Sequence, residues 1–242
     1  MRIARIFTPQ ALTPGTSLSL EEDASRHLSK VLRMKVGREV TLFNGEGGEY
    51  TAFITHIDKK STTLEIKEGC DTDRESPLDV ELCIGISRGE RMDWVLQKAT
   101  ELGVSKITPV FTERTEVKLN AQRLEKKMSH WRQIIISACE QCQRNRLPLV
   151  NPPQNLSEYL PQCSSDMKLV LHHRSDEKLS EREKPESLTL LVGPEGGLSE
   201  SEIQTAEKNG FAPLTLGPRV LRTETAPLVA LSLCQYRWGD LF

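Results

Sequence analysis

The pattern of hydrophobic and polar positions changes near residue 72, and this change divides the chain into two parts. Before it, short runs rich in β-branched and aromatic residues occupy 39–43, 50–57 and 62–66, with polar turns between them. Such runs predict the strands of a small β-rich unit. A helical pattern over about 21–34 interrupts this unit, and the polar stretch 69–77 has the composition of a linker.

From residue 78 onward, strand-like and helix-like runs alternate. The strand-like runs cover 78–87, 106–111, 167–173, 187–192 and 212–216. Helical spacing covers 90–103 and about 121–143, and two further helices are expected to begin at Ser199 and near Glu224. This alternation predicts an α/β fold with a mostly parallel sheet covered by helices on both faces. We therefore expect two domains, 1–72 and 73–242.

Composition narrows the class of protein. The 242 residues are 37% hydrophobic and 27% charged, which predicts a packed core rather than disorder. Apolar runs fall short of the roughly 20 residues that a membrane span needs, and the first residues do not resemble a signal peptide, so we expect a cytoplasmic location. The net charge of −2 argues against general attraction to nucleic acid but leaves room for a local basic surface.

The six cysteines give little sign of metal or redox chemistry. Cys139 and Cys142 form the closest pair, but both fall inside a predicted helix and have no second pair or nearby histidine to complete a zinc site. We expect them to pack within the fold as reduced thiols, and we expect no metal.

Two glycine-bearing turns follow predicted strands late in the chain. The first is the run from Gly193 to Gly197, and the second is the run from Leu216 to Arg219. Ser199 and Glu202 have the spacing of a capping box, which fixes a helix start beside the first turn. Neither a dinucleotide fingerprint after the first α/β strand nor a P-loop occurs. The two turns therefore predict a small-molecule site late in the sheet, at the carboxyl ends of its strands.

Basic residues gather in two regions. Arg26, Lys30 and Arg33 share one face of the predicted N-terminal helix, which favours phosphate contact over an ordinary solvated face. The opposite face of that helix is expected to be apolar: Ala24, Leu28, Val31 and Leu32. In the larger part, arginines lie near strand ends, in the last turn or after the long helix: Arg88, Arg91, Arg114, Arg144, Arg146, Arg219 and Arg222. A pocket with this rim suits a polyanionic substrate.

The chain resembles a known family in five motifs. LVGPEGGLSESEI and LGPRVLRTETA contain the two turns, and HLSKVLRMKVG, GERMDWVLQKATELGV and EQCQRNRLP precede them in the expected order. Together they resemble the RsmE family, the uracil-N3 methyltransferases of 16S ribosomal RNA, which belong to the SPOUT superfamily. The resemblance covers essentially the whole chain.

The resemblance implies a C-terminal SPOUT-type domain with a trefoil knot, an N-terminal PUA-like RNA-binding β-barrel, and a homodimer. It also implies S-adenosylmethionine as the cofactor and 16S rRNA of the small ribosomal subunit as the partner. The expected cofactor-binding residues are Leu171, His172, Gly193, Glu195, Gly196, Gly197, Leu216, Gly217, Leu221 and Thr223. The expected RNA-binding residues are Arg5, Arg26, Lys30, Arg33, Arg88, Arg91 and Arg114.

The implied reaction sets requirements for the site. N3 of uracil carries a proton, so the site must stabilise a uracil anion or supply a base, and it must align N3 with the methyl group. Arg222 is the candidate for stabilising charge on a uracil oxygen, while Glu195 and Glu224 are candidates for the base or for ordinary helix-start contacts. Two alternatives remain open: an RNA-binding or ribosome-assembly factor whose cofactor site is vestigial or regulatory, and an enzyme that methylates a ribose 2′-oxygen.

Overall fold

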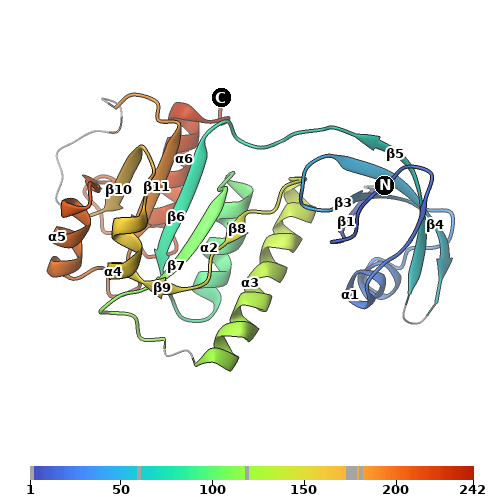
Figure 1. The fold of residues 1–242 in the computed structure, drawn as a ribbon, viewed down its shortest axis with the longest axis horizontal. Coiled ribbons are helices and arrows are strands. Elements are labelled where there is room, and N and C mark those ends of the chain that lie inside the picture. The colour runs from blue at the N-terminus through green and yellow to red at the C-terminus, as the bar shows by residue number, and fades with distance from the viewer. Residues whose placement is uncertain (1–2, 59–60, 118–119, 173–178, 180–181) are drawn as a thin grey trace. The chain divides into compact units, whose positions relative to one another are not determined.

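The computed structural model describes residues 3–58, 61–117, 120–172, 179 and 182–242. Its contacts divide the chain into two compact units (Figure 1). Unit 1 consists of Met1–Glu75 together with Cys139–Leu147, and unit 2 consists of Ser76–Ala138 together with Pro148–Phe242. One segment from the middle of the chain therefore completes the N-terminal unit. That the units act as an RNA-binding and a methyltransferase domain, with a boundary at 72, stays a prediction.

Unit 1 is built on one mixed sheet. Its strands are β1 (Ala4–Phe7), β2 (Ser17–Ser19), β3 (Glu39–Phe43), β4 (Glu49–Ile57) and β5 (Thr62–Cys70). They run in the order β1-β3-β4-β5-β2, with β1 parallel to β3 and the other neighbours antiparallel. Alternate residues of these strands, such as Val40, Leu42, Leu64 and Ile66, are fully buried in one hydrophobic cluster. In the described pairings β1 and β2 are the end strands, and closure into a barrel stays a prediction.

The N-terminal helix is shorter and less regular than the prediction of 21–34. α1 (Glu22–Arg26) passes directly into a π-helical turn, η1 (His27–Val31), in which Leu32 N donates to His27 O at 3.0 Å. In a π-helical turn, each residue rotates less about the helix axis than in an α-helix. The residues beyond His27 therefore do not lie on the faces expected for a straight α-helix. The chain then leaves the helix.

This irregular ending corrects two expectations about the helix faces. Arg33 has a φ of 51° and lies outside the helix, so it does not share a helical face with Arg26 and Lys30. Leu28 is buried as expected, but Val31 and Leu32 are 66% and 41% exposed. The predicted apolar face therefore holds only for its first two members.

The segment Cys139–Leu147 is fixed to unit 1 through buried polar contacts. The Phe7 amide donates to Glu140 Oε1 at 3.0 Å, and the Arg5 guanidinium binds Asn145 Oδ1. Asn145 is buried and donates from Nδ2 to Thr72 O at 2.8 Å. Residues 140–147 of the EQCQRNRLP motif are thus a structural part of the N-terminal unit.

An ion pair between Arg144 and Glu75 connects the segment Cys139–Leu147 to the end of the predicted linker. Arg144 Nε donates to both carboxylate oxygens of Glu75, at 3.2 and 3.1 Å, and its Nη2 also pairs with Glu75. The two side chains are only 6% and 19% exposed. Arg74 likewise donates to Glu49 Oε2 at 3.0 Å, so the polar stretch before unit 2 is bound to unit 1 rather than free.

Unit 2 is built on a parallel sheet. Its strands are β6 (Asp79–Gly85), β7 (Lys106–Phe111), β8 (Leu149–Val150), β9 (Gln154–Asn155), β10 (Met167–Leu171), β11 (Ser187–Val192) and β12 (Ala212–Leu214). The order is β12-β10-β11-β6-β7-β8, with β9 also on β7, and every described pairing is parallel. Figure 1 shows β10, β11, β6 and β7 as neighbours. The carboxyl ends of all these strands meet at one edge.

Helices cover both faces of this sheet, as predicted. They are α2 (Glu90–Glu101), α3 (Ala121–Cys142), α4 (Leu156–Tyr159) with the 3-10 turn η2 (Leu160–Gln162), α5 (Glu200–Lys208) and α6 (Ala226–Trp238). α2 packs against α6, and α4 packs against α5 and β7. Central β6 is buried from Val80 to Gly85, which explains its mostly apolar sequence, interrupted by Glu81. The predicted α/β class is confirmed, while β8, β9 and α4 were not predicted.

In the part of the chain that the structure describes, no helix is long and apolar enough to cross a membrane.

The Arg144–Glu75 pair predicts a large cost of truncation. Arg144→Ala leaves a mostly buried carboxylate without its cation, so the free energy of unfolding should fall by about 3 kcal/mol. Arg123→Ala, on the exposed surface of α3, is the matched control and should change it by less than about 0.5 kcal/mol. Urea-induced unfolding measures both values. Equal stability of the two variants would show that the segment is not held by this pair.

Candidate active site

A cavity of about 490 Å³ lies at the carboxyl edge of the unit 2 sheet. Three connections form most of it: the residues directly after β10, the run from β11 into α5, and the run from β12 into α6. Arg114, which follows β7, also lines it. Its lining includes apolar side chains, exposed backbone and charged groups. This is the edge at which open parallel sheets bind small molecules, because backbone amides and helix starts point out of it.

The structure brings all of the expected cofactor-binding residues together. The ten residues from Leu171 to Thr223 named above all line the cavity. Arg222 does not line it; its side chain is exposed, and its carbonyl accepts the amides of Thr225 and Ala226 at 2.9 Å at the start of α6. A catalytic role for Arg222 stays a prediction.

Other lining residues were not among the expected cofactor-binding residues: Val192, Pro194, Leu198, Glu200, Ile203, Leu214, Thr215, Arg219, Val220 and Ala226, together with Arg114, which was expected to bind RNA. Most of them are neighbours of the named positions, at the last residue of a strand or in the first turn of the following helix. The strand-to-helix pattern could have supplied them, because every residue around such a junction faces the same edge.

The first glycine turn depends on a missing side chain. A Cβ added at Gly193 would lie 2.7 Å from Leu198 N and 2.8 Å from Gly197 C, both backbone atoms. Gly197 has a φ of 68°, and its amide donates to Pro194 O at 2.8 Å. The chain folds back on itself so closely that only glycine fits at 193.

A second glycine supports this turn from the neighbouring strand. A Cβ at Gly85, the last residue of β6, would lie 2.5 Å from both Pro194 Cδ and Pro194 N. Gly85 was not among the site residues expected from the sequence. Its position at the end of a strand suggests a place near the site. The contact with Pro194, however, depends on the pairing of β6 with β11, which the sequence does not reveal.

The start of α5 is fixed beside the turn by the predicted capping box. The Glu202 amide donates to Ser199 Oγ at 3.2 Å, and the Ser199 amide donates to Glu202 Oε2 at 2.8 Å. The box satisfies amides at the helix start and holds the first turn of α5 against the cavity.

Backbone contacts also join the other two connections. His172 N donates to Leu214 O at 3.1 Å, and Thr215 Oγ1 donates to His172 O at 3.0 Å. These bonds continue the β10–β12 pairing past the strand ends. They place Leu171 and His172 beside the second glycine turn. His173, the last residue of the predicted strand-like run 167–173, lies outside the described residues.

Arg91 lies between the two carboxylates considered as bases. Its guanidinium is 3.2 Å from Glu195 Oε1 and 4.0 Å from Glu224 Oε2, and the Arg88 amide donates to Glu195 at 2.9 Å. Burial raises the pKa of Glu195, but the hydrogen bonds from the Arg88 amide and the Arg91 side chain outweigh it, so the pKa is lowered. A carboxylate held in its charged form is a poor proton acceptor, which argues against Glu195 as the base.

The other arginines expected to bind RNA from unit 2 also have contacts within the chain. Arg114 Nη1 donates to Gly196 O at 2.7 Å, and Arg88 Nη2 is 2.8 Å from Glu116 Oε2. Both side chains remain exposed at the rim. RNA contact by Arg88, Arg91 and Arg114 stays a prediction, but each of them has a local structural task as well.

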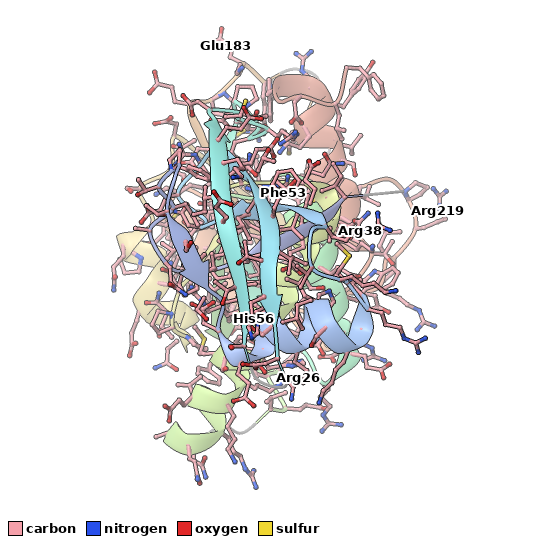
Figure 2. The ribbon with its side chains drawn as sticks, turned by 90° about the vertical axis from the view of Figure 1, so that its right-hand side faces the viewer. Arg26, Arg38, Phe53, His56, Glu183 and Arg219 are labelled. Atoms are coloured by element: carbon pink, nitrogen blue, oxygen red, sulfur yellow. The ribbon has the colours of Figure 1, made fainter. Side chains whose placement is uncertain are left out.

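The four cations of unit 1 that were expected to bind RNA fall into two groups, one buried and one exposed. Arg5 is buried: its side chain is 8% exposed, bonded to Glu49 at 2.6 Å and stacked 5.2 Å from the Phe43 ring centre. This placement argues against the expected RNA contact by Arg5. Arg26, Lys30 and Arg33 are exposed, and Arg26 is labelled in Figure 2 together with Arg38. For these three, RNA binding stays a prediction.

Among the described residues, no group of three or more histidine, cysteine or acidic side chains could hold a metal ion. Cys139 is buried, and its Sγ lies 3.7 Å from Arg146 O. A hydrogen bond with Cys142 and burial raise the pKa of Cys139, which is typical of an inert packing thiol.

Comparison with known proteins agrees with this geometry. Residues 74–235 match the family described as RNA methyltransferase domain, and residues 20–67 match the family described as RNA methyltransferase PUA domain. Ribosomal RNA small subunit methyltransferase E of Buchnera aphidicola subsp. Schizaphis graminum is 36% identical over 99% of this chain and 98% of its own. The chain belongs to the ribosomal RNA small subunit methyltransferase E family. The Bacillus subtilis member is 30% identical over 96% of this chain and 94% of its own.

Solved structures of similar proteins support the same fold. A putative methyltransferase from Legionella pneumophila, in complex with bound S-adenosylmethionine, has a TM-score of 0.97 at 44% identity and 100% coverage of both chains. The methyltransferase E of Neisseria gonorrhoeae, bound to S-adenosyl methionine, has a TM-score of 0.93 at 41% identity, also with 100% coverage of both chains. The predicted two-part fold with a PUA-like N-terminal domain is confirmed, whereas the trefoil knot stays a prediction.

The lowered pKa of Glu195 predicts a pH dependence. The folded carboxyl titrates below its usual value of 4.5, so its contribution to stability is complete at neutral pH and is lost as the pH falls through the folded pKa. Wild type should therefore be more stable than Glu195→Gln at about pH 7, and the difference should shrink below about pH 4.5. Urea unfolding across this range measures it. Glu183→Gln, an exposed carboxylate labelled in Figure 2, should show no such trend.

Proposed function

We propose that this chain transfers a methyl group from S-adenosylmethionine to N3 of a specific uridine in 16S ribosomal RNA of the small subunit. The observation that carries this proposal is the cavity at the carboxyl edge of the unit 2 sheet, which gathers every expected cofactor residue. Two relatives with the same fold over their whole length were solved with that cofactor bound. The uracil-N3 specificity rests on the family resemblance.

The residues of the cavity fit this cofactor. A volume of about 490 Å³ is in the range of small-molecule sites. Val192, Leu198 and Ile203 supply apolar surface for an adenosine, and the carboxylates of Glu195 and Glu200 suit the two cationic groups of the cofactor. Gly193 and its neighbours allow a ligand to approach bare backbone. When bound, S-adenosylmethionine supplies an activated methyl group.

The chain's own task is then positioning and charge control. The connections after β10, β11 and β12 must hold the methyl donor in one orientation while N3 of the uracil is aligned with it. N3 becomes a nucleophile only as its proton leaves, so negative charge develops on the uracil oxygens. A cation at the rim of the cavity stabilises this charge, and Arg222 is the residue that we assign to it.

Glu195 is a poor candidate for the proton acceptor, because its carboxylate accepts hydrogen bonds from Arg91 and the Arg88 amide. Glu224 remains the candidate among the two, because its 4.0 Å separation from Arg91 is a looser contact. Thr223 on one side of it lines the cavity.

RNA recognition would fall mainly to unit 1. Its exposed cations Arg26, Lys30 and Arg33 lie in a stretch without acidic residues between Arg26 and Arg38. A base within folded RNA must be unstacked before N3 can be reached, and contacts to the surrounding phosphates offset that cost. We further propose that the chain works in the cytoplasm as a homodimer, as the resemblance implies.

The assignment of Arg222 predicts a loss of turnover rather than of cofactor binding. Arg222→Ala should lower kcat for methyl transfer to unmethylated small subunits about 100-fold, since it removes charge stabilisation needed only during reaction. The cofactor Kd should change less than about threefold, because Arg222 does not line the cavity. Transfer of tritium from labelled S-adenosylmethionine measures the rate, and Arg123→Ala is the control.

Three outcomes of that assay would contradict the proposal at different points. Unchanged kcat in Arg222→Ala would remove the role of Arg222 alone. A wild type that binds RNA but transfers no methyl group at any salt concentration would indicate an assembly factor. A methylated nucleoside identified as 2′-O-methyluridine would indicate ribose chemistry instead of N3 chemistry.

The tight backbone at Gly193 predicts a separate effect on the cofactor. Gly193→Ala forces the turn open, because its Cβ would meet backbone atoms, so the cofactor Kd should rise at least about tenfold. Gly210→Ala is the matched control: its φ is 87° but open space surrounds the added Cβ. That variant should lose about 1 kcal/mol of stability and keep its cofactor affinity. Calorimetric titration distinguishes the two effects, and equal affinities would contradict the assigned role of the turn.

A further inference from the structure

Glu113 and Arg114, the second and third residues after β7, make hydrogen bonds to the β11–α5 connection. In the sheet, β7 and β11 are not neighbours, because β6 lies between them. Glu113 and Arg114 nevertheless extend past the end of β6 and reach the segment that contains the first glycine turn. One contact is made to the turn itself, at Gly196, and the other to the start of the helix that follows.

Arg114 binds the turn itself. Its Nη1 donates to Gly196 O at 2.7 Å, and its stem packs on the same residue. A Cβ added at Gly196 would lie 3.1 Å from Arg114 Cβ and 3.3 Å from Arg114 Cδ. A side chain at this position would press on the arginine stem, which would have to shift by a few tenths of an ångström. A carbonyl bonded to a guanidinium is held in one orientation more firmly than one exposed to water.

Glu113 binds the start of α5. Its amide donates to Glu202 Oε1 at 2.8 Å, and its own Oε1 accepts a hydrogen bond from Ser201 Oγ at 2.9 Å. The second oxygen of Glu202 accepts the Ser199 amide in the capping box. One carboxylate thus joins the helix start to the end of β7.

We propose that Glu113 and Arg114 are positioning residues that hold the Gly193–Gly197 turn and the start of α5 in the shape that binds the cofactor. The inference rests on the proposed function of this cavity. A turn held in its bound shape before the ligand arrives loses less entropy on binding, which strengthens affinity without any contact to reacting atoms. In this role Arg114, which also lines the cavity, acts on the cofactor through its bond to Gly196 O, and its expected contact with RNA is secondary.

The two roles of Arg114 predict different consequences of substitution. Loss of an RNA contact raises the KM for the RNA and leaves cofactor binding unchanged. Loss of a positioning contact raises the cofactor Kd and leaves the RNA KM unchanged. Glu113 sharpens the distinction, because removing a negative charge cannot weaken attraction to a polyanion.

The experiment uses the full chain, with calorimetric titration of S-adenosylmethionine and methyl transfer to unmethylated small subunits. Arg114→Ala should raise the cofactor Kd about tenfold, because the bond to Gly196 O is lost. Glu113→Ala should raise it about threefold, because the bond from Ser201 Oγ is lost while the backbone amide of residue 113 still donates to Glu202. The RNA KM should stay within about twofold of wild type in both. At saturating cofactor, kcat of Arg114→Ala should return close to the wild-type value, which a catalytic group would not allow. Arg123→Ala is the control.

The proposal is overturned by an unchanged cofactor Kd in Arg114→Ala, and a raised RNA KM in that variant would assign the residue to RNA instead. If Arg114→Ala does not fold in a thermal melt, Arg114→Lys carries the same test with the charge retained. A cofactor Kd equal to wild type in Arg114→Lys and in Glu113→Ala overturns the proposal. A wild type that does not bind S-adenosylmethionine is a different result, since it refutes the proposed function first.

Discussion

The close approach of the turn after β11 to the end of β6 is the contact on which the rest of the site depends. Gly193 folds against its own turn, and Gly85 leaves room for Pro194. A side chain at either position would push the turn away from the sheet. The capping box, the Arg114 contact and the Glu195 contacts are all made by residues in this turn or directly after it, so they depend on its position. The lack of a side chain at Gly85 and at Gly193 thus determines where these polar groups can make contact.

The charged residues around the cavity make contacts within the protein itself, independent of any substrate. Arg91 holds Glu195, and Arg114 holds Gly196, although both arginines stood out in the sequence as polyanion contacts. Arg5 is an extreme case, since its guanidinium is buried in unit 1. An arginine at a strand end is therefore ambiguous: the same fork of donors that binds phosphate also fixes a loop carbonyl or a carboxylate.

Much of the fold and of the cavity could be predicted from the sequence, because strand and helix periodicities are local and parallel strands share one edge. β7 (Lys106–Phe111) and the Ser199 capping box match their predictions. The π turn after His27 was missed, since spacing alone does not reveal a change in helical winding. The Gly85–Pro194 approach and the buried Arg5 were missed as well, because both depend on residues that are distant in sequence.

The placement of Cys139–Leu147 in unit 1 has a consequence for how the chain is made. The N-terminal β-unit lacks Asn145 and Arg144, the partners of Arg5 and Glu75, until residue 147 has left the ribosome. By then more than half of the chain has been synthesised, including β6 and β7 of the second unit. The two units cannot simply fold one after the other in order of synthesis, as consecutive domains usually do. Chaperones that bind nascent chains would meet this protein with its first domain still incomplete.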